Sequence, residues 1–208
     1  MKNKSLNLIL VLIVFLLMGP FVFSGTTDSR RFNSIVDFEE RMQLNEAASC
    51  FSAAHAGILK FLKCVELSDY KPLDYTESLR MIDDALENVR AAGDLYRRFL
   101  KVPDFSVMDN GAQYRLVNFD YEACREKYSF NRHVFNEVRS YLEKGNSRGV
   151  YLRLLGDVER IEDLLEAVKV ELKQEKSPEL KNLWRLGETC AVSTMFRQYA
   201  DCILREAR

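Results

Sequence analysis

Apolar residues recur at alternating spacings of three and four through most of the chain, which is the period of an α-helix that buries one face. The clearest stripe has seven members: Tyr151, Leu154, Val158, Ile161, Leu165, Val168 and Leu172. Comparable stripes in four other segments predict about five long amphipathic helices. Helices of this kind with short connections favour an all-α fold, an antiparallel bundle with coiled-coil-like packing at shallow crossing angles.

Capping and helix-breaking residues set the expected boundaries of these helices. The predicted helices cover about residues 34–67, 74–101, 120–144, 147–176 and 177–206. Asp74 is an N-cap with Glu77 in the capping-box position, and Val102 before Pro103 is pushed out of the helical region. Ser177 supplies an N-cap followed by proline at the first helical position.

The segment over residues 103–119, between the second and third predicted helices, has no helical period. Asn110 and Gly111 form a tight-turn signal, and apolar residues alternate on both sides of it. We expect either a small hairpin or an irregular loop that covers one end of the core. A connection this long inside a compact domain often carries function.

The N-terminus has the three-part pattern of a secretory signal peptide over residues 1–24. Two lysines precede an uncharged apolar run over residues 6–18, Pro20 then breaks the helix, and a cleavage site lies before Gly25. The alternative is an uncleaved signal anchor, since the apolar stretch is almost long enough to span a bilayer. Both interpretations predict an extracytoplasmic location, periplasmic or secreted in the first case and membrane-tethered in the second.

The rest of the chain is predicted to form a flexible segment over residues 25–33 and one helical domain over residues 34–208. Without the signal peptide, 28 basic and 31 acidic side chains remain, which gives a net charge of −3. A nucleic-acid-binding surface would show clustered positive charge instead. We therefore expect no nucleic-acid partner, and no membrane contact beyond the signal sequence.

Five cysteines follow the signal sequence, and disulfides persist outside the cytoplasm. Cys50 and Cys64 on one helix would be roughly 21 Å apart, and Cys190 and Cys202 on another roughly 18 Å apart. A disulfide requires Cα atoms within about 7 Å of each other, so neither pair can close. Any bridge among these four residues must therefore join the first helix to the fifth.

Cys50 and Cys64 are fourteen residues apart, and Cys190 and Cys202 are twelve apart. These spacings are similar enough for two disulfides to join the first helix to the fifth. A parallel arrangement pairs Cys50 with Cys190 and Cys64 with Cys202. An antiparallel arrangement pairs Cys50 with Cys202 and Cys64 with Cys190. Strict alternation of five helices favours the parallel one; a single bridge and buried free thiols are the alternatives. Cys124, on the stripe of the third helix, is expected to be a buried free thiol, with a reactive or intermolecular thiol as its alternative.

His55 is the other candidate site residue, because it lies on the apolar stripe of the first helix between Phe51 and Ile58. It is interpreted as a core histidine held by one hydrogen bond. The alternative is a haem or metal ligand, with a methionine such as Met81 or Met195 from another helix. No C-x-x-C-H is present and no histidine follows a glutamate at the di-iron spacing, so no cofactor is expected.

No catalytic pattern is evident. The chain lacks Gly-x-Ser-x-Gly and a glycine-rich phosphate loop, and its carboxylate clusters fall on polar helix faces. We therefore expect an exported, non-catalytic helical bundle that acts through protein–protein interaction in the cell envelope or outside the cell. The alternative function is a bundle that binds a small ligand, haem or a metal through His55.

Overall fold

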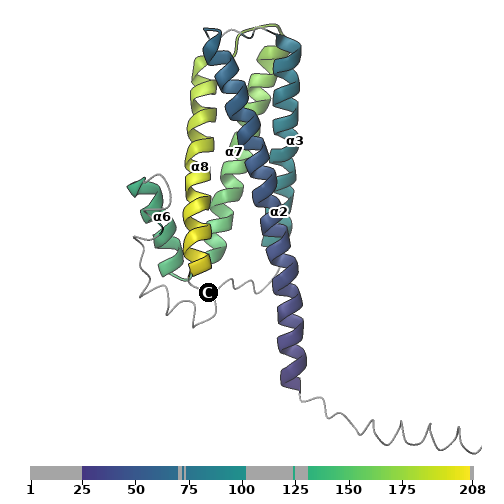
Figure 1. Ribbon diagram of the computed structural model, residues 1–208, viewed down its shortest axis with the longest axis vertical. Helices are drawn as coiled ribbons and strands as arrows, with labels where there is room; N and C mark the ends of the chain where they lie inside the picture. The colour runs from purple at the N-terminus through teal and green to yellow at the C-terminus, as the bar shows by residue number, and fades with distance from the viewer. Residues whose placement is uncertain (1–24, 70–71, 73, 102–123, 125–130, 207–208) are drawn as a thin grey trace, which may run out of the picture. The chain divides into compact units, whose positions relative to one another are not determined.

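The computed structural model describes residues 25–69, 72, 74–101, 124 and 131–206 (Figure 1). The predicted signal peptide and the predicted hairpin or loop over residues 103–119 lie outside this described part. The chain divides into two units, Met1–Arg41 and Met42–Arg208. In the described part of the first unit the backbone is helical, and the second unit contains the bundle.

All regular structure among the described residues is helical, which confirms the predicted all-α bundle. The helices are α2 (Gly25–Leu67), α3 (Tyr75–Leu100), α6 (Arg132–Glu143), α7 (Ser147–Lys173) and α8 (Leu180–Glu206). The start of α2 differs from the prediction. It begins at Gly25 rather than near Ser34 and so includes the segment 25–33, where no glycine or proline follows Gly25 to interrupt a helix.

The N-cap of α3 is the one expected from the sequence. The Asp74 carboxylate accepts hydrogen bonds from the backbone N–H groups of Thr76 and Glu77, at 2.8 and 3.1 Å. It thereby satisfies two donors that have no partner within the helix. The helix ends at Leu100, two residues before the Val102-Pro103 break.

Four long helices alternate in direction. Along α2 and α8, contacts run from Ser52 with Arg197 to Leu62 with Gly187, so ten residues up α2 correspond to ten residues down α8. Ion pairs between α3 and α7 show the same antiparallel order, as do the contacts of α8 with α7, from Ser193 with Asp157 to Asn182 with Glu171. The arrangement is an up-down-up-down bundle of α2, α3, α7 and α8.

Helix α6 does not take part in this alternation. It is short and packs beside one end of α8 and α7 (Figure 1). The predicted continuous helix over residues 120–144 is wrong, because Asn131 has an extended backbone with φ −118° and ψ 105°. Its side chain accepts hydrogen bonds from the N–H groups of His133 and Val134, so a new helix begins there.

The core follows the predicted stripes closely in the C-terminal half. All seven apolar residues of the α7 stripe are buried, and Phe99 meets Tyr151 edge to face with ring centroids 4.9 Å apart. The inward face of α2 includes the predicted positions Phe51 and Ile58 but passes through Ala54 rather than His55. Its buried residues are Ala47, Phe51, Ala54, Ile58, Phe61 and Val65, which leaves His55 half-buried at the edge of the face.

The disulfide differs from the prediction. Cys124 bonds to Cys202, with Cα atoms 5.9 Å apart, and Cys50, Cys64 and Cys190 are free thiols. The general prediction of a disulfide is thus confirmed, but the bridges between the first and fifth helices are wrong. The prediction of Cys124 as a free thiol is wrong as well, since this residue is buried within the bridge.

Two physical reasons account for the wrong pairing. First, α6 lies outside the alternation, so α2 and α8 are antiparallel and the favoured parallel pairs never face each other. Second, the side chains point in different directions around their helices: Cys64 is exposed to solvent, whereas Cys190 is fully buried. The antiparallel alternative therefore fails too.

Candidate functional site

The most distinctive surface feature is an apolar groove between α2 and α8, with a volume of about 510 Å³. Its lining consists of Leu59, Leu62, Lys63 and Glu66 from α2 and Leu183, Trp184, Gly187 and Glu188 from α8. We refer to these eight residues as the α2/α8 groove. Four of them are large apolar residues, and three, Lys63, Glu66 and Glu188, are charged.

The floor of the α2/α8 groove depends on a glycine. A Cβ atom at Gly187 would lie 3.3 Å from Leu62 Cδ1, which is tighter than ordinary van der Waals contact. The absence of a side chain at this position therefore allows α8 to approach α2 closely and leaves a hollow above the contact. A glycine inside a helix costs about 1 kcal/mol relative to alanine, and this close approach accounts for Gly187 within α8.

The walls of the groove expose large apolar side chains to solvent. Trp184, the only tryptophan of the chain, is 70% exposed, and Leu59 is 49% exposed. Leu67 and Leu180, in the adjacent turns of the two helices, are also exposed. A tryptophan left in water forgoes a large hydrophobic stabilisation, and such residues mark protein interaction sites when they gather in one patch.

Charged residues border this apolar surface. Lys63 Nζ lies 3.4 Å from Glu66 Oε2, and both side chains are largely in solvent. Glu188 stands on the opposite wall and is exposed as well. An apolar centre with a polar, solvated rim is the usual anatomy of a protein–protein interface.

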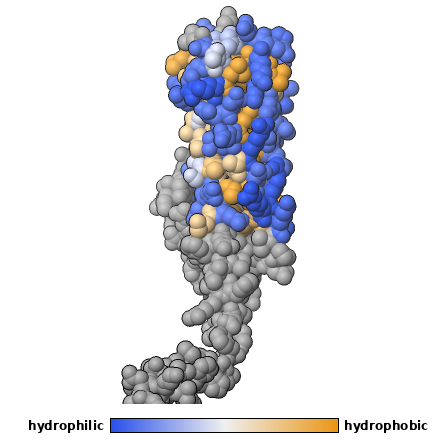
Figure 2. Space-filling view, turned by 90° about the vertical axis from the view of Figure 1, so that its right-hand side faces the viewer, coloured by the Kyte–Doolittle hydropathy of each residue, from blue (hydrophilic) through white to orange (hydrophobic). Residues whose placement is uncertain are grey.

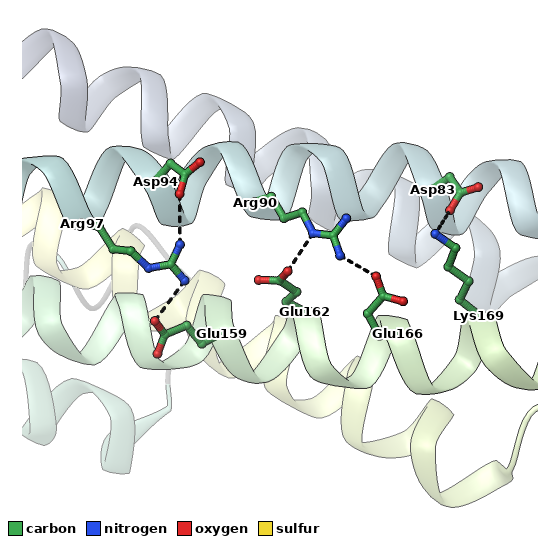
Figure 3. A network of polar contacts seen from close by, with 8 residues as sticks. All are labelled: Asp83, Arg90, Asp94, Arg97, Glu159, Glu162, Glu166 and Lys169. Carbon is green, nitrogen blue, oxygen red and sulfur yellow. Dashed lines mark hydrogen bonds and ion pairs between the residues drawn. The ribbon is translucent and has the colours of Figure 1, made fainter.

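The face of the bundle on the α3 side has a different character. Figure 2 shows mostly hydrophilic residues there, with hydrophobic ones in smaller patches among them. Figure 3 shows ion pairs that join α3 to α7: Arg90 reaches Glu162 at 2.7 Å and Glu166 at 2.5 Å, and Lys169 reaches Asp83 at 2.7 Å. These charges are satisfied by each other.

Carboxylates that the sequence places on polar helix faces thus provide contacts between helices. Glu159 and Glu162 of α7 and Asp83 of α3 each pair with a basic residue on the neighbouring helix. Ion pairs this exposed contribute little stability individually. They fix the register of α3 against α7.

Half-buried His55 has a hydrogen-bond partner on the neighbouring helix. Its Nδ1 atom lies 3.1 Å from Thr194 Oγ1 of α8. Burial lowers the pKa of His55 below its usual value, and the positive charge of Arg197 lowers it further. The imidazole is therefore neutral near pH 7.

The arrangement around His55 offers no further metal ligands. Within the described part of the chain, no group of three His, Cys, Asp or Glu side chains is placed to hold a metal ion. The ligand-binding alternative stays a prediction. A Soret band, or stoichiometric metal lost on His55→Ala, would support it.

Two of the free thiols, Cys50 and Cys190, lack the lowered pKa of a catalytic nucleophile. Burial, together with the nearby Asp157 carboxylate, raises the pKa of Cys190 to about 12. Burial and then the charge of Glu46 raise the pKa of Cys50 as well. A cysteine nucleophile requires the opposite shift, because the thiolate is the reactive form.

A buried polar network at the α6 end of the bundle was not predicted from the sequence. Asp157, only 6% exposed, accepts hydrogen bonds from Arg153 of the same helix and from Ser193 of α8. Arg153 also reaches Glu137 of α6 at 2.9 Å. The network ties three helices together, and each buried polar group in it has a partner, as stability requires.

The α2/α8 groove was missed as well. Leu62 and Leu183 were predicted to lie on inward stripes, whereas Leu59 and Trp184 fall outside the stripes and looked like isolated surface positions. The available signal was Trp184 itself: it lies one position after the stripe residue Leu183, on the outward side of α8. A large aromatic residue off the stripe marks a second apolar face.

Comparison of the chain with protein-family models, with curated proteins and with solved structures finds no match.

None of the helices in the described residues is both long enough and apolar enough to cross a bilayer.

Proposed function

We propose that this protein is an exported, non-catalytic helical bundle that binds another protein chain through the α2/α8 groove. The observation that carries the proposal is the exposed apolar surface of that groove, with Trp184 on its rim and Gly187 at its floor. Trp184 has the features of an interface anchor, since tryptophan is enriched among the residues that dominate binding energy.

The geometry favours the apolar face of a helix as the occupant. The groove runs between two antiparallel helices, and its α2 wall extends from Leu59 to Glu66, about 10 Å at 1.5 Å per residue. That length corresponds to two helical turns. A partner helix with apolar residues three and four apart would place them between the two walls.

Export is the second part of the proposal. It is supported by the charged, apolar and small-residue pattern over residues 1–24. The Cys124–Cys202 disulfide supports it independently, since disulfides are rare in the cytoplasm. Fusion of residues 1–24 to a reporter that folds only after export tests this part directly.

Site-specific photo-crosslinking in the native host tests the binding surface. A photoreactive amino acid at Leu59 is expected to give cross-linked products that the Trp184→Ser change reduces by at least about tenfold, the equivalent of 1.4 kcal/mol. The matched control places the same photoreactive residue at Asp163, an exposed position of α7. Equal cross-linking from both positions, or products unaffected by Trp184→Ser, would refute the groove as the binding site.

A further inference from the structure

We propose that the chain which fills the α2/α8 groove is a second copy of this protein, in a two-fold symmetric dimer. The inference rests on the proposed function and names the partner of the same site. The dimer axis runs along the groove, so that α2 of each copy lies over α8 of the other. A two-fold interface uses the same patch on both copies, so the patch must complement itself.

The shape of the groove meets this requirement. Trp184 projects from α8 with 70% of its surface exposed, and Gly187, one turn further along the same face, contributes no side chain. A projection and a hollow thus stand side by side on each copy. When α2 of one copy covers α8 of the other, each indole packs against α2 of its partner beside Leu62, and Leu62 of the partner lies over the hollow at Gly187.

The positions along the helices support the same docking. Within one copy, Leu62 lies opposite Gly187, so the two residues have the same position, or level, along the helix axes. Trp184 is three residues before Gly187, which places it about 4.5 Å from the level of Leu62 at 1.5 Å per residue. A rotation about an axis along the groove preserves these levels. The indole ring of one copy therefore reaches Leu62 of the other without any shift along the axis.

The charges on the rim are complementary in this arrangement. Lys63 stands on the α2 wall and Glu188 on the α8 wall. Their levels differ by two residues, about 3 Å, so Lys63 of each copy meets Glu188 of the other across the interface. Two such pairs form per dimer, and they discriminate against the docking in which α2 lies over α2 and like charges face each other.

Sedimentation equilibrium of the exported chain, with its disulfide intact, tests the proposal. Over about 1–500 µM, the range in which a standard-size interface of modest affinity is populated, we expect a monomer–dimer equilibrium. Trp184→Ser is expected to raise the dimer Kd at least about 30-fold, the loss typical of a hot-spot residue. The matched control, Leu152→Ser, removes another half-exposed apolar side chain from α7 and should leave the Kd unchanged.

Exchanging the charges of Lys63 and Glu188 distinguishes a lost interface from a lost fold, because a misfolded variant would not be rescued by the second substitution. Lys63→Glu and Glu188→Lys should each weaken the dimer, and the double variant should recover the original Kd within about threefold because both pairs re-form with exchanged signs. A monomer at all concentrations, equal effects of Trp184→Ser and Leu152→Ser, or a double variant no better than the single ones would each overturn the dimer.

The two proposals fail in different ways. If the protein is monomeric but the photoreactive residue at Leu59 still captures a different chain in a Trp184-dependent manner, the dimer is wrong and the groove remains a binding site. If the cross-linked product contains two copies of this chain joined between α2 and α8, both proposals are supported. Absence of both dimer and cross-link removes the groove from consideration.

Discussion

Removal of the Cys124–Cys202 disulfide should lower the stability of the bundle by a predictable amount. The bridge joins residues 78 positions apart. A bridge that closes a ring of that size restricts the unfolded chain, and the lost loop-closure entropy corresponds to a stabilisation of the folded state of about 4.5 kcal/mol at 25 °C. The helices themselves should persist, since the packed stripes of α3, α7 and α8 do not depend on the bond.

Urea unfolding followed by circular dichroism measures this loss. The oxidised and the reduced protein are compared first, because reduction leaves both sulfur atoms in place and creates no cavity. The double variant Cys124→Ala/Cys202→Ala is the second comparison: it should be at least as unstable as the reduced protein, and a reducing agent should not change it further. Both cysteines are buried, so the alanine substitutions add a small packing cost to the loss of the bond.

Thiol counting establishes that the comparison concerns the right bond. Unfolded but unreduced protein should expose three alkylatable thiols, which are Cys50, Cys64 and Cys190. Reduction should expose two more. Five reactive thiols before reduction would refute the bridge, and a difference below about 1 kcal/mol between oxidised and reduced protein would refute the loop-entropy argument.

Three further predictions concern single side chains. Asp157→Ala should cost about 3 kcal/mol in urea unfolding, because it leaves buried donors unpaired, whereas Asp163→Ala on the exposed face should be silent. The pKa of His55 is lowered in the folded state, so its neutral form contributes stability that is complete above the unfolded pKa near 6.5 and is lost as the pH falls through that value toward the folded pKa. His55→Gln should flatten the stability profile in that window, and an unchanged slope would contradict the assignment. In native protein, alkylation of exposed Cys64 should be complete well before that of Cys190, whose reaction requires opening of the core; equal rates would argue against the buried position of Cys190.

The fold class was predictable because one strong periodic signal determines it. The seven-residue stripe of α7 is fully buried, and Asp74 caps α3 in the expected way. Both features are local: a helix stripe needs only the spacing of apolar residues, and a cap needs only a side chain within reach of two N–H groups. Local features of this kind survive in any bundle.

The disulfide was not predictable because it depends on how many helices take part in the up-down alternation between α2 and α8. The pairing of the first and fifth helices assumed that each predicted helix occupies one place in the alternation. The extended backbone at Asn131 interrupts the third predicted helix, and α6, which begins after it, lies outside the alternation. With one helix fewer in the alternation, α8 runs antiparallel to α2 instead of parallel. The cysteine pairs that were favoured for parallel helices therefore do not face each other.

The candidate site was harder still to predict, since its exposed apolar residues lie outside the stripes. Trp184 and Leu59 are unremarkable when each is read along its own helix, and they form a surface only because α2 and α8 are neighbours. Likewise Asp157 adjoins the buried stripe residue Val158, and only the position of Ser193 on α8 explains why a carboxylate is tolerated there. Sites shared by two helices require the tertiary arrangement.

The Cys124–Cys202 bond also divides the polypeptide into a closed ring and an open arm. The ring contains α6, α7 and nearly all of α8, whereas α2 and α3 precede it in the arm. A protease that cuts once inside the ring leaves all its pieces covalently joined, but one cut between Leu100 and Cys124 leaves the α2–α3 hairpin attached by packing alone. In a protease-rich environment the arm, which carries one wall of the α2/α8 groove, is therefore the part of the molecule that a single cleavage can release.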